Sequence, residues 1–428
     1  MTVLAAKTRD IVRKLQRTVT ESPRVVAGLA VLIFAAIGTV LLVSSHAATP
    51  TASYEAESGA LSGNASLLGD ASASGSSSVK FSSTAQTLTC SLHATTANFA
   101  AQVTAATAGQ VICLASGDYG TWTGTNKAIT ITKQAGATAN MDLELTNGDA
   151  NFTIDGLSGM GGTMTGNTIK NITIRNSTFS GAIVMMQLSN ANVLLDNNVH
   201  NNIDVGSGCT GWPARVMVSE STGSAGVTVT NSLLSGGNSD GIKIDSDGVT
   251  VIGNQFIDIK EKNSNDCAHT DSIQFNGAGN AIIRNNYFRG GSDGIVAFDT
   301  TYTNQITNNV CVSLVRGACV TLYSDRNSVV EHNVAYGGMD ALEIDHKSAD
   351  PVGSGTIFRN NIGGLSAANG STVSVNTKNL FSGASGTNIN GTPTYVGGTS
   401  PTTWEGFKLA AGSAGKGAAT DGLDVGIN

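Results

Sequence analysis

The chain has 428 residues, of which 52 are glycine, 13% are charged and 5% are aromatic. Its formal net charge of −7 excludes the strongly basic character typical of nucleic-acid-binding proteins, so no nucleic acid partner is expected. Abundant glycine with few aromatic residues is typical of a chain with many turns and a narrow apolar interior.

The N-terminal residues form an export signal rather than part of a fold. Residues 25–43 carry no charge and follow a basic segment, residues 1–24. This order places the N-terminus in the cytoplasm and the rest of the chain across the membrane. The small-x-small sequence Ser45-His46-Ala47 suits cleavage of a signal peptide, and the length of the segment equally suits a retained membrane anchor. We therefore predict an extracellular or cell-surface protein, bound to the membrane through this helix if it is uncleaved.

Residues 44–88 are rich in Ser, Ala, Gly and Thr, as is typical of a linker. Within them, "SYEAESGALSG" and "SSVKF" resemble the opening of β-sandwich carbohydrate-binding modules. The segment is too short for a sandwich, which normally needs about 100 residues. No sugar site is assigned to it.

An asparagine recurs at one place in a repeating frame between about residues 170 and 361. Ser177 and Ser232 fill the same position in two repeats. From Ser177 onward the spacings are 21, 34, 22, 32, 23, 24 and 28 residues, which indicates a base period of about 22 residues with two long insertions. Asparagine suits a buried corner because it tolerates strained backbone and carries both a donor and an acceptor. The column contains Asn198, Asn254, Asn286, Asn309, Asn333 and Asn361.

This period, with short Val, Ile and Thr runs between Gly, Asn, Ser and Asp turns, predicts an all-β solenoid. Each coil adds strands to long parallel sheets, which makes residues 89–428 a parallel β-helix. We expect it to be right-handed because parallel crossovers prefer that hand. A monomer is expected.

A short capping helix is expected to close the N-terminal end of the solenoid, where strand edges and apolar interior would otherwise be exposed. Thr96 would be its N-cap, Phe99, Val103 and Ala106 would share its buried face, and Gly109 would end it. With the next run, "GQVICLASGDYG", this helix resembles the opening segment of pectate-lyase-like right-handed β-helix proteins. The C-terminal run "FKLAAGSAGKGAATDGLDVGIN" is similar to their closing segment.

One strand per coil is expected to carry polar side chains on its outer face. Alternation along "SDGIKID", "HTDSIQF", "SDGIVAF", "GACVTLY" and "MDALEID" points alternate residues inward, including Ile242, Ile273, Ile295, Cys319 with Thr321, and Leu342. The residues between them form two outward columns, and Arg215 is placed one outward position before the first. The columns are Met217, Lys243, Gln274, Val296, Val320 and Glu343, and Ser219, Asp245, Asn276, Phe298, Leu322 and Asp345.

Polar residues of neighbouring coils should reach a common substrate, because coils stack about 4.8 Å apart. The two longest spacings, 34 and 32 residues, place insertions on either side of the Lys243 coil, where they would form the walls of a groove. Their candidate lining residues are Trp212, Lys260, Glu261, Lys262, Asp266, His269 and Asp271.

Six cysteines in an exported chain favour disulfides. The first pair would tie the capping helix to the first coil, and the second would bridge the two insertions. For the third pair, which falls in inward columns, a disulfide and two buried thiols are both open. The pairs are Cys90 with Cys113, Cys209 with Cys267, and Cys311 with Cys319.

Many pectate-lyase-like proteins cleave acidic polysaccharides by β-elimination, so the resemblance implies an exported lyase acting on a uronate-containing polysaccharide. This chemistry needs a base and a positive charge beside the substrate carboxylate. Lys243 is our first choice as base, with Arg215 or a bound Ca²⁺ to lower its pKa, and His269 as alternative base or as acid. Calcium ligands would come from Asp245, Asp271, Asp266 and Asp240. Substrate contacts would come from Gln274, Asn276, Trp212 and Lys262.

Two other functions remain open. A glycoside hydrolase would use Asp245 with Asp271 or Asp266. A noncatalytic glycan-binding surface protein would use Trp212 and Phe298. The adjacent aspartates and Gly-His-Gly of polygalacturonase-type hydrolases and the Asp-Pro-His-Glu run of alginate epimerases are absent from the sequence.

Several candidates also have a structural interpretation. Asp240 and Asp293 share a turn column with Asp271, where aspartate often caps a turn. Lys243 would otherwise be a solvated surface lysine. His200 falls in a column of apolar residues and is expected to be packed. Glu343 with Asp345 is open between a subsidiary sugar or cation site and a solvated acidic pair.

Overall fold

The computed structural model has two compact units, Met1–Thr87 and Leu88–Asn428. In the first unit, β1 (Ala65–Gly69) and β2 (Ser77–Phe81) pair antiparallel. The predicted export segment, residues 25–43, lies outside the described residues. No helix among the residues that the structure describes is long and apolar enough to cross a membrane. The structure describes residues 65–69, 77–81, 88–205, 214–263 and 270–428.

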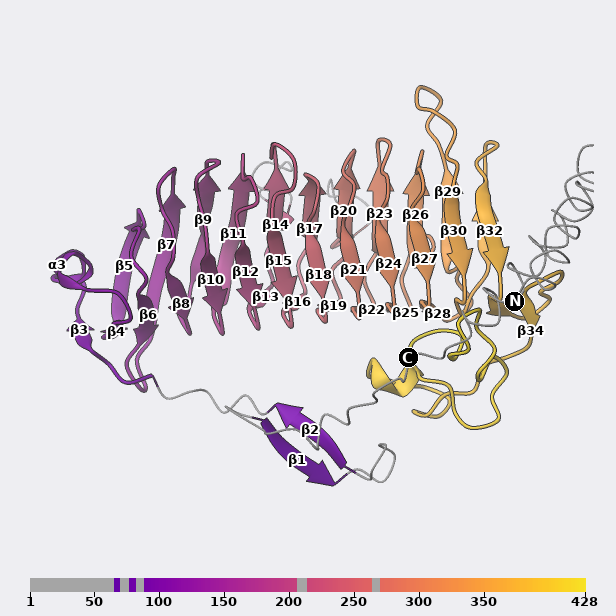
Figure 1. Ribbon diagram of the computed structural model, residues 1–428, viewed down its shortest axis with the longest axis horizontal. Helices are drawn as coiled ribbons and strands as arrows, with labels where there is room; N and C mark the ends of the chain where they lie inside the picture. The colour runs from indigo at the N-terminus through magenta and orange to yellow at the C-terminus, as the bar shows by residue number, and fades with distance from the viewer. Residues whose placement is uncertain (1–64, 70–76, 82–87, 206–213, 264–269) are drawn as a thin grey trace, which may run out of the picture. The chain divides into compact units, whose positions relative to one another are not determined.

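The second unit is a parallel β-helix, in which successive coils add neighbouring strands to three parallel sheets (Figure 1). The first sheet has 13 strands: β3 (Leu92–Ala94), β4 (Val111–Leu114), β6 (Thr130–Lys133), β8 (Thr153–Asp155), β10 (Ile172–Arg175), β12 (Val193–Asp196), β15 (Val227–Thr230), β18 (Thr250–Ile252), β21 (Ile282–Arg284), β24 (Gln305–Thr307), β27 (Val329–Glu331), β30 (Thr356–Arg359) and β32 (Val373–Thr377).

The other two sheets share the long strand β11. The second sheet contains β5 (Gly117–Trp122), β7 (Ala139–Leu145), β9 (Met160–Thr165), β11 (Thr178–Met186), β14 (Ala214–Ser219), β17 (Asp240–Asp245), β20 (Asp271–Asn276), β23 (Asp293–Phe298), β26 (Val320–Tyr323), β29 (Leu342–Asp345) and β31 (Leu365–Ala367). The third sheet starts at the first residues of β11 and continues through β13 (Val199–Asn201), β16 (Leu233–Ser235), β19 (Gln255–Ile257), β22 (Tyr287–Arg289), β25 (Val310–Val312) and β28 (Val334–Tyr336).

Alternation along the strands builds the interior. In β17, Ile242 and Ile244 are fully buried, whereas Lys243 and Asp245 are partly exposed. The parallel register stacks Ile242 on Ile273, so each coil continues the same apolar column. The predicted parallel β-helix is therefore confirmed.

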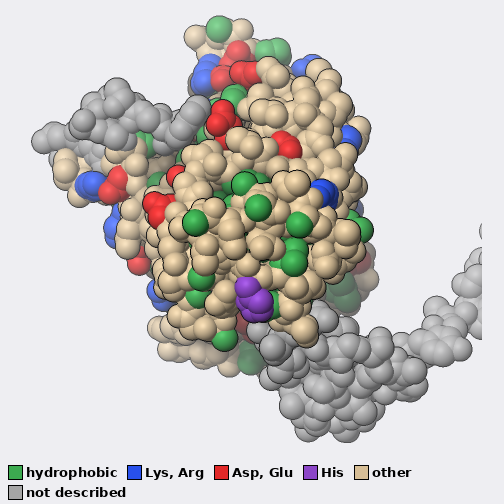
Figure 2. All heavy atoms as spheres, turned by 90° about the vertical axis from the view of Figure 1, so that its left-hand side faces the viewer, with side chains coloured by type: hydrophobic (Ala, Val, Ile, Leu, Met, Phe, Trp, Pro, Cys, Tyr) green, Lys and Arg blue, Asp and Glu red, His purple; other side chains and the backbone are tan. Residues whose placement is uncertain are grey.

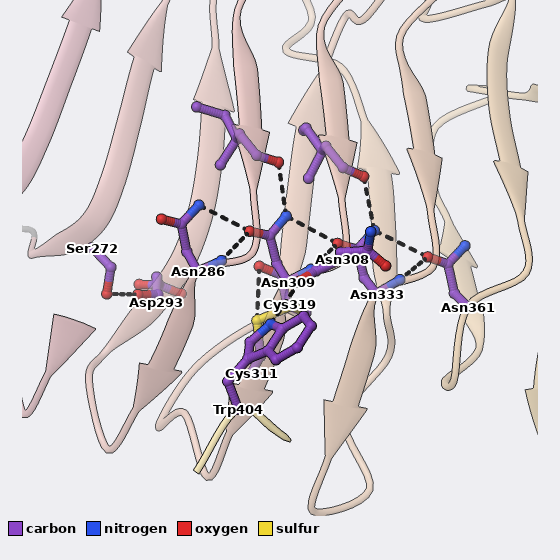
Figure 3. Close-up of a disulfide and its surroundings, with 12 residues drawn as sticks. Ser272, Asn286, Asp293, Asn308, Asn309, Cys311, Cys319, Asn333, Asn361 and Trp404 are labelled. Atoms are coloured by element: carbon purple, nitrogen blue, oxygen red, sulfur yellow. Dashed lines mark hydrogen bonds between the residues drawn. A yellow bond between two sulfur atoms is a disulfide. The ribbon is translucent and has the colours of Figure 1, made fainter. Parts of the chain in front are cut away.

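The asparagine column forms a hydrogen-bonded ladder along one corner. The backbone N–H of Asn286 donates to Oδ1 of Asn309 at 3.1 Å, and that of Asn309 donates to Oδ1 of Asn333 at 2.9 Å (Figure 3). The side-chain Nδ2 of Asn309 donates to the carbonyl of Ile283 at 2.9 Å. Each buried amide thus satisfies polar groups on the coils at both sides. The predicted column is confirmed, and it continues to Asn379.

The residue before each column asparagine carries the strained backbone. Asn197, Asn308 and Asn360 have φ values of 51°, 55° and 59°, in the left-handed region that asparagine tolerates. From the sequence, both strain tolerance and hydrogen bonding are expected of the column residue. In the structure, the column residue makes the hydrogen bonds, and the residue before it adopts the strained backbone.

A helix, α3 (Phe99–Ala105), lies at the N-terminal end of the β-helix beside β3 and β5 (Figure 1). Phe99 and Val103 are buried in the apolar interior. The Phe99 ring packs edge-on against Tyr119 and Trp122, with centroid distances of 5.4 and 5.9 Å. On the surface at this end, hydrophobic side chains are dispersed among uncharged polar groups (Figure 2).

The ends of α3 differ from those predicted. The N-cap is Asn98 rather than Thr96, and the helix ends before Ala106 rather than at Gly109. The Oδ1 of Asn98 accepts the N–H of Thr95 at 2.7 Å, so this side chain closes the preceding turn and makes no hydrogen bond to the helix.

Two of the predicted cysteine pairs fall within the described residues, and both are disulfides. The first joins the chain before β3 to β4, and so links two coils rather than α3 to a coil. The second joins β25 to the turn before β26 in the interior (Figure 3), which excludes the alternative of two buried thiols. They are Cys90–Cys113 and Cys311–Cys319, with Cα–Cα distances of 5.6 and 5.5 Å. The pair Cys209 and Cys267 lies outside the described residues.

The C-terminal segment, residues 391–428 after β34 (Ile389–Asn390), covers part of the outer face of the third sheet. Phe407, in the 3-10 helix η4 (Glu405–Phe407), is fully buried, and its ring centroid lies 5.2 Å from that of Tyr336 and 5.3 Å from that of Tyr395. These rings join Val310 and Val334 of β25 and β28 in a second apolar cluster, outside the coil interior. Beyond β28, parallel bridges from Val334 to Ile362 and from Ile362 to Leu380 continue the third sheet to β33 (Leu380–Phe381), which pairs with β34.

Candidate functional site

Polar side chains gather on the outer face of the second sheet at β17 and β20. Lys243 is in register with Gln274 of the next coil. The Nζ of Lys243 lies 3.8 Å from Oδ2 of Asp245, and these side chains are 18% and 22% exposed. The Nδ2 of Asn276 donates to Oδ1 of Asp245 at 3.0 Å. The structure therefore brings together four of the predicted site residues, as the register required.

The Asp245 carboxyl is partly withdrawn from water. Burial raises its pKa above the ordinary value, and the nearby charge of Asp299 adds to this increase. The charge of Lys243 and the hydrogen bond from Asn276 act in the opposite direction without cancelling it. Asp245 accordingly holds a proton more readily than a solvated aspartate does.

Aromatic rings continue this face beyond β20. Phe298 of β23 is in register with Asn276, and its ring stacks on Tyr323 of β26 with centroids 5.3 Å apart and an interplanar angle of 23°. Lys347 Nζ lies 5.0 Å from the centroid of the Phe298 ring and also pairs with Asp299 at 2.5 Å. The face thus offers a cation and amides beside flat apolar surface, a combination that suits a polar ligand with apolar faces.

The predicted register is wrong in β26. Val320 and Leu322, expected to face outward, are fully buried and pair with Ile295 and Ala297. Thr321, expected inside, is aligned with Val296, and Tyr323 takes the outward position next to Phe298. The prediction aligned "GACVTLY" on its cysteine. An alignment that places Val320 and Leu322 in the inward column of Ile295 and Ala297 predicts that Tyr323 faces outward.

Arg215 is not on the outer face, which corrects the sequence prediction. It is fully buried, and its guanidinium donates to the carbonyls of His200 at 3.1 Å and Ser235 at 3.0 Å, and to those of Ile203 and Gly236. Burial lowers the pKa of Arg215 to about 10, against the opposing charges of Asp204 and Asp240.

Arg215 is buried because it lies at the corner between the third and second sheets. The chain bends there, so simple alternation does not extend back from Met217 to Arg215. The corresponding residue of the next coil is Gly241, where an added Cβ would lie 3.0 Å from the Phe256 ring of the interior. Arg215 therefore holds the corner together and cannot contact a substrate.

The aspartates of the turn column are buried. Asp271 is fully buried and Asp240 is 4% exposed. The backbone N–H of Asp271 donates to Oδ1 of Asp240 at 2.8 Å, a hydrogen bond between neighbouring coils. Asp293, in register with Asp271, pairs with Arg316 at 2.7 Å.

The structure describes three of the four residues predicted as calcium ligands. Within the described parts of the chain, no three His, Cys, Asp or Glu side chains converge as ligands. Asp240 and Asp271 are buried in the turn column, whereas Asp245 is on the outer face. The burial of Asp271 also argues against Asp245 and Asp271 as the two carboxylates of a hydrolase, since both must reach one glycosidic bond. Asp266 lies outside the described residues.

The described ends of the two insertions meet at one corner. Lys262 Nζ pairs with Oδ2 of Asp204 at 2.9 Å, with 56% of the Lys262 side chain exposed. This pair lowers the pKa of Asp204. Glu261, a predicted lining residue, pairs with Arg316 at 2.8 Å. His269 and Trp212 lie outside the described residues, and their predicted roles stay predictions.

A second acidic group lies further along the same sheet. Burial raises the pKa of Glu343 on β29, and the neighbouring carboxylates of Asp345 and Asp340 raise it further. Burial, followed by the charges of Glu343 and Asp345, also raises the pKa of Tyr323, which is in register with Asp345. Glu343 is thus partly withdrawn from water.

Comparison with known proteins bears on the fold. Residues 216–381 match the family model described as "Right handed beta helix region". These residues form a right-handed β-helix. The match includes β17, β20 and β23, and so covers the face that carries Lys243. It confirms the handedness predicted from crossover preference. A search of curated proteins found no match to this chain.

Among solved structures, the chain is similar to the PL6 family alginate lyase AlyGC, with 14% identity and a TM-score of 0.43, over 78% of this chain and 58% of that chain. It is similar to a PL6 alginate lyase in complex with a trisaccharide, with 13% identity and a TM-score of 0.46, over 78% and 94%. It also resembles the A-module of mannuronan C-5 epimerase AlgE4 from Azotobacter vinelandii, with 11% identity and a TM-score of 0.35, over 68% and 94%.

Proposed function

We propose that the outer face of the second sheet binds an acidic, uronate-containing polysaccharide and cleaves it by β-elimination. The observation that carries this proposal is the Lys243 cluster, in which an ammonium lies 3.8 Å from Asp245 on a partly exposed face. Gln274 is next to Lys243 in register, and Asn276 binds Asp245. The stacked rings of Phe298 and Tyr323 lie on the following coils.

β-Elimination at a uronate moves one proton and breaks one bond. A base removes the proton at C5, the electron pair forms the C4–C5 double bond, and the C4–O4 bond breaks as O4 takes a proton. A cation beside the carboxylate stabilises the charge that develops when C5 loses its proton. Arg215 cannot supply that cation, because it is buried.

We assign Lys243 to the substrate carboxylate. A lysine side chain binds a carboxylate in its charged form, the usual form at neutral pH, and only a neutral amine could accept the C5 proton. The role of base predicted for Lys243 is therefore less well supported. His269 stays the candidate for base, and calcium assistance stays a prediction to be tested with a chelator.

Export fits this function, because a polysaccharide substrate would be met outside the cytoplasm. The two disulfides support this part of the proposal, since disulfides persist mainly in oxidising compartments. Recovery of the chain from the culture medium, or from the outside of the cell membrane, would test export. A purely cytoplasmic location would contradict it.

The deciding experiment is a cleavage assay on uronate polysaccharides, including alginate and polygalacturonate, followed by ultraviolet absorbance of the unsaturated product. We expect activity in the unmodified chain and a loss of about 10²–10³-fold in Lys243→Ala, the usual cost of removing one charge-stabilising group. Lys243→Arg keeps the charge but cannot act as a base, so it should keep activity within about tenfold of the unmodified chain. A matched control is Lys133→Ala, an exposed lysine at the end of β6 in the first sheet.

The outcomes separate the candidate functions. Equal loss in Lys243→Ala and Lys243→Arg would return the role of base to Lys243. New reducing ends without ultraviolet absorbance would indicate a hydrolase. Binding without any product would leave a noncatalytic glycan-binding protein, and unchanged activity in Lys243→Ala would remove the proposal.

A further inference from the structure

A pocket lies on a different face of the β-helix from the Lys243 cluster. It has a volume of about 430 Å³ and forms where the C-terminal segment meets the third sheet. Gln255 of β19 and Tyr287 of β22 border it from the sheet, and Trp404 and Glu405 border it from the C-terminal segment. Gln255 and Tyr287 are in register on the outer face of the third sheet. The Lys243 cluster is on the second sheet and contributes no residue to this pocket.

The C-terminal cover stops at Tyr287. Its ring belongs to the apolar cluster under the cover and lies 6.4 Å from the ring of Phe407. Tyr287 is only 5% exposed, yet its hydroxyl has no hydrogen-bond partner among the described residues. A buried hydroxyl without a partner costs free energy. A ligand that supplies a hydroxyl to this pocket would remove that cost.

A hydrogen bond fixes the indole of Trp404 and leaves its ring surface, rather than its N–H, available to the pocket. Its Nε1 donates to the carbonyl of Asn308 at 2.8 Å, which uses its only polar group (Figure 3). The remaining indole surface borders the pocket as a flat apolar wall. Lys408 Nζ lies 5.5 Å from the ring centroid, but Lys408 is not one of the pocket residues.

The polar part of the wall consists of amides. The Nδ2 of Asn231 donates to Asp196 at 2.8 Å, which leaves its Oδ1 oriented as an acceptor. Gln255 and Asn285 are exposed and add further donors and acceptors. Glu405 is the one lining side chain with a charge at neutral pH, so an anionic ligand would meet repulsion.

We propose that this pocket is a binding site for an uncharged sugar unit, separate from the uronate-binding face. A neutral sugar presents hydroxyls to the amides and to Tyr287, and the flat C–H face of its ring to Trp404. The proposal does not depend on the proposed lyase activity, because no residue is shared between the two sites.

Isothermal titration calorimetry of the full chain would test this, with cellohexaose, maltohexaose and mannohexaose as neutral probes and trigalacturonate as the charged one. We expect at least one neutral probe to bind, and Tyr287→Phe to weaken its binding about tenfold, which corresponds to about 1.4 kcal/mol. Tyr287→Phe removes a hydroxyl that has no partner in the described protein, so the variant should unfold at the same temperature as the unmodified chain or above it.

Two controls make the result specific. Tyr302→Phe removes a hydroxyl bound to Asp247 at 2.6 Å, away from the pocket, and should leave sugar binding unchanged. Trp404→Ala should abolish binding. The proposal is overturned if no neutral probe binds, if binding survives both Tyr287→Phe and Trp404→Ala, or if Lys243→Ala removes neutral-probe binding as well. The last outcome would place the sugar on the face of the proposed lyase site.

Discussion

His200 shows how a polar side chain can be used as an apolar one inside the β-helix. It occupies the column of Phe179, and the two rings stack with centroids 4.2 Å apart and an interplanar angle of 10°. His200 is fully buried, and neither ring nitrogen has a hydrogen-bond partner among the described residues. The packed role predicted from its column is confirmed. The neutral ring tolerates this position, but the protonated ring would bring an unpaired charge into the interior.

This burial predicts a loss of stability in acid that depends on one residue. Burial, followed by the charge of Arg215, lowers the pKa of His200 from 6.5 to about 3 in the folded chain. Below pH 6.5 the unfolded chain therefore binds a proton that the folded chain does not, and the free energy of unfolding falls by about 1.4 kcal/mol per pH unit until about pH 3. In His200→Phe, which keeps the stack, this contribution should disappear. Urea unfolding at pH 7.5 and pH 4.5 measures it, and an unchanged difference between the two pH values would contradict the assignment.

At the level of strands and coils, the sequence predicts the features that recur once in every coil. The asparagine column and the outward pairs on β17 and β20 follow from periodicity, because parallel register copies each position onto the next coil. The predictions fail where the chain bends. Arg215 lies at the corner, and "GACVTLY" reaches its corner one residue later than the alignment assumed. Positions in corners depend on local bending, which hydrophobic alternation does not report.

The corner column has no room for a side chain at Gly241. Gly241 follows Arg215 in this column, and a Cβ added to it would lie 2.2 Å from the carbonyl oxygen of Ser272 on the next coil. That atom is backbone, so Gly241→Ala must separate two coils, and we expect it to lower the free energy of unfolding by about 1–3 kcal/mol. Gly181→Ala in β11 is the matched control, because its nearest atoms would be 3.7 and 3.9 Å away. Urea midpoints compare the two, and equal midpoints would show that the coils can move apart freely.

At the scale of the whole second unit, the C-terminal segment is the part that the sequence predicts least well. Its resemblance to a closing segment gave no indication that it covers the third sheet. The sequence did contain a sign of the cover. Val310 and Val334 occupy the same outward position that the polar Gln255 occupies on an earlier coil, and apolar residues at an outward position indicate that something covers them. The pocket at Trp404 could not be predicted, because it joins residues more than a hundred positions apart through packing rather than through coil register.

Because contacts in a solenoid are made between neighbouring coils, damage to this cover should stay local. Phe407 is fully buried between Tyr336 and Tyr395, and Phe407→Ala should cost about 3–5 kcal/mol in the stability of the cover. Hydrogen exchange should accelerate in the C-terminal segment, where the N–H of Val396 donates to the carbonyl of Lys408, and stay slow in β6 to β12 of the first sheet. Val396→Ala, in the same segment but with Val396 67% exposed, should change neither. Acceleration that spread through the first sheet would show that the cover stabilises the whole β-helix rather than one face of it.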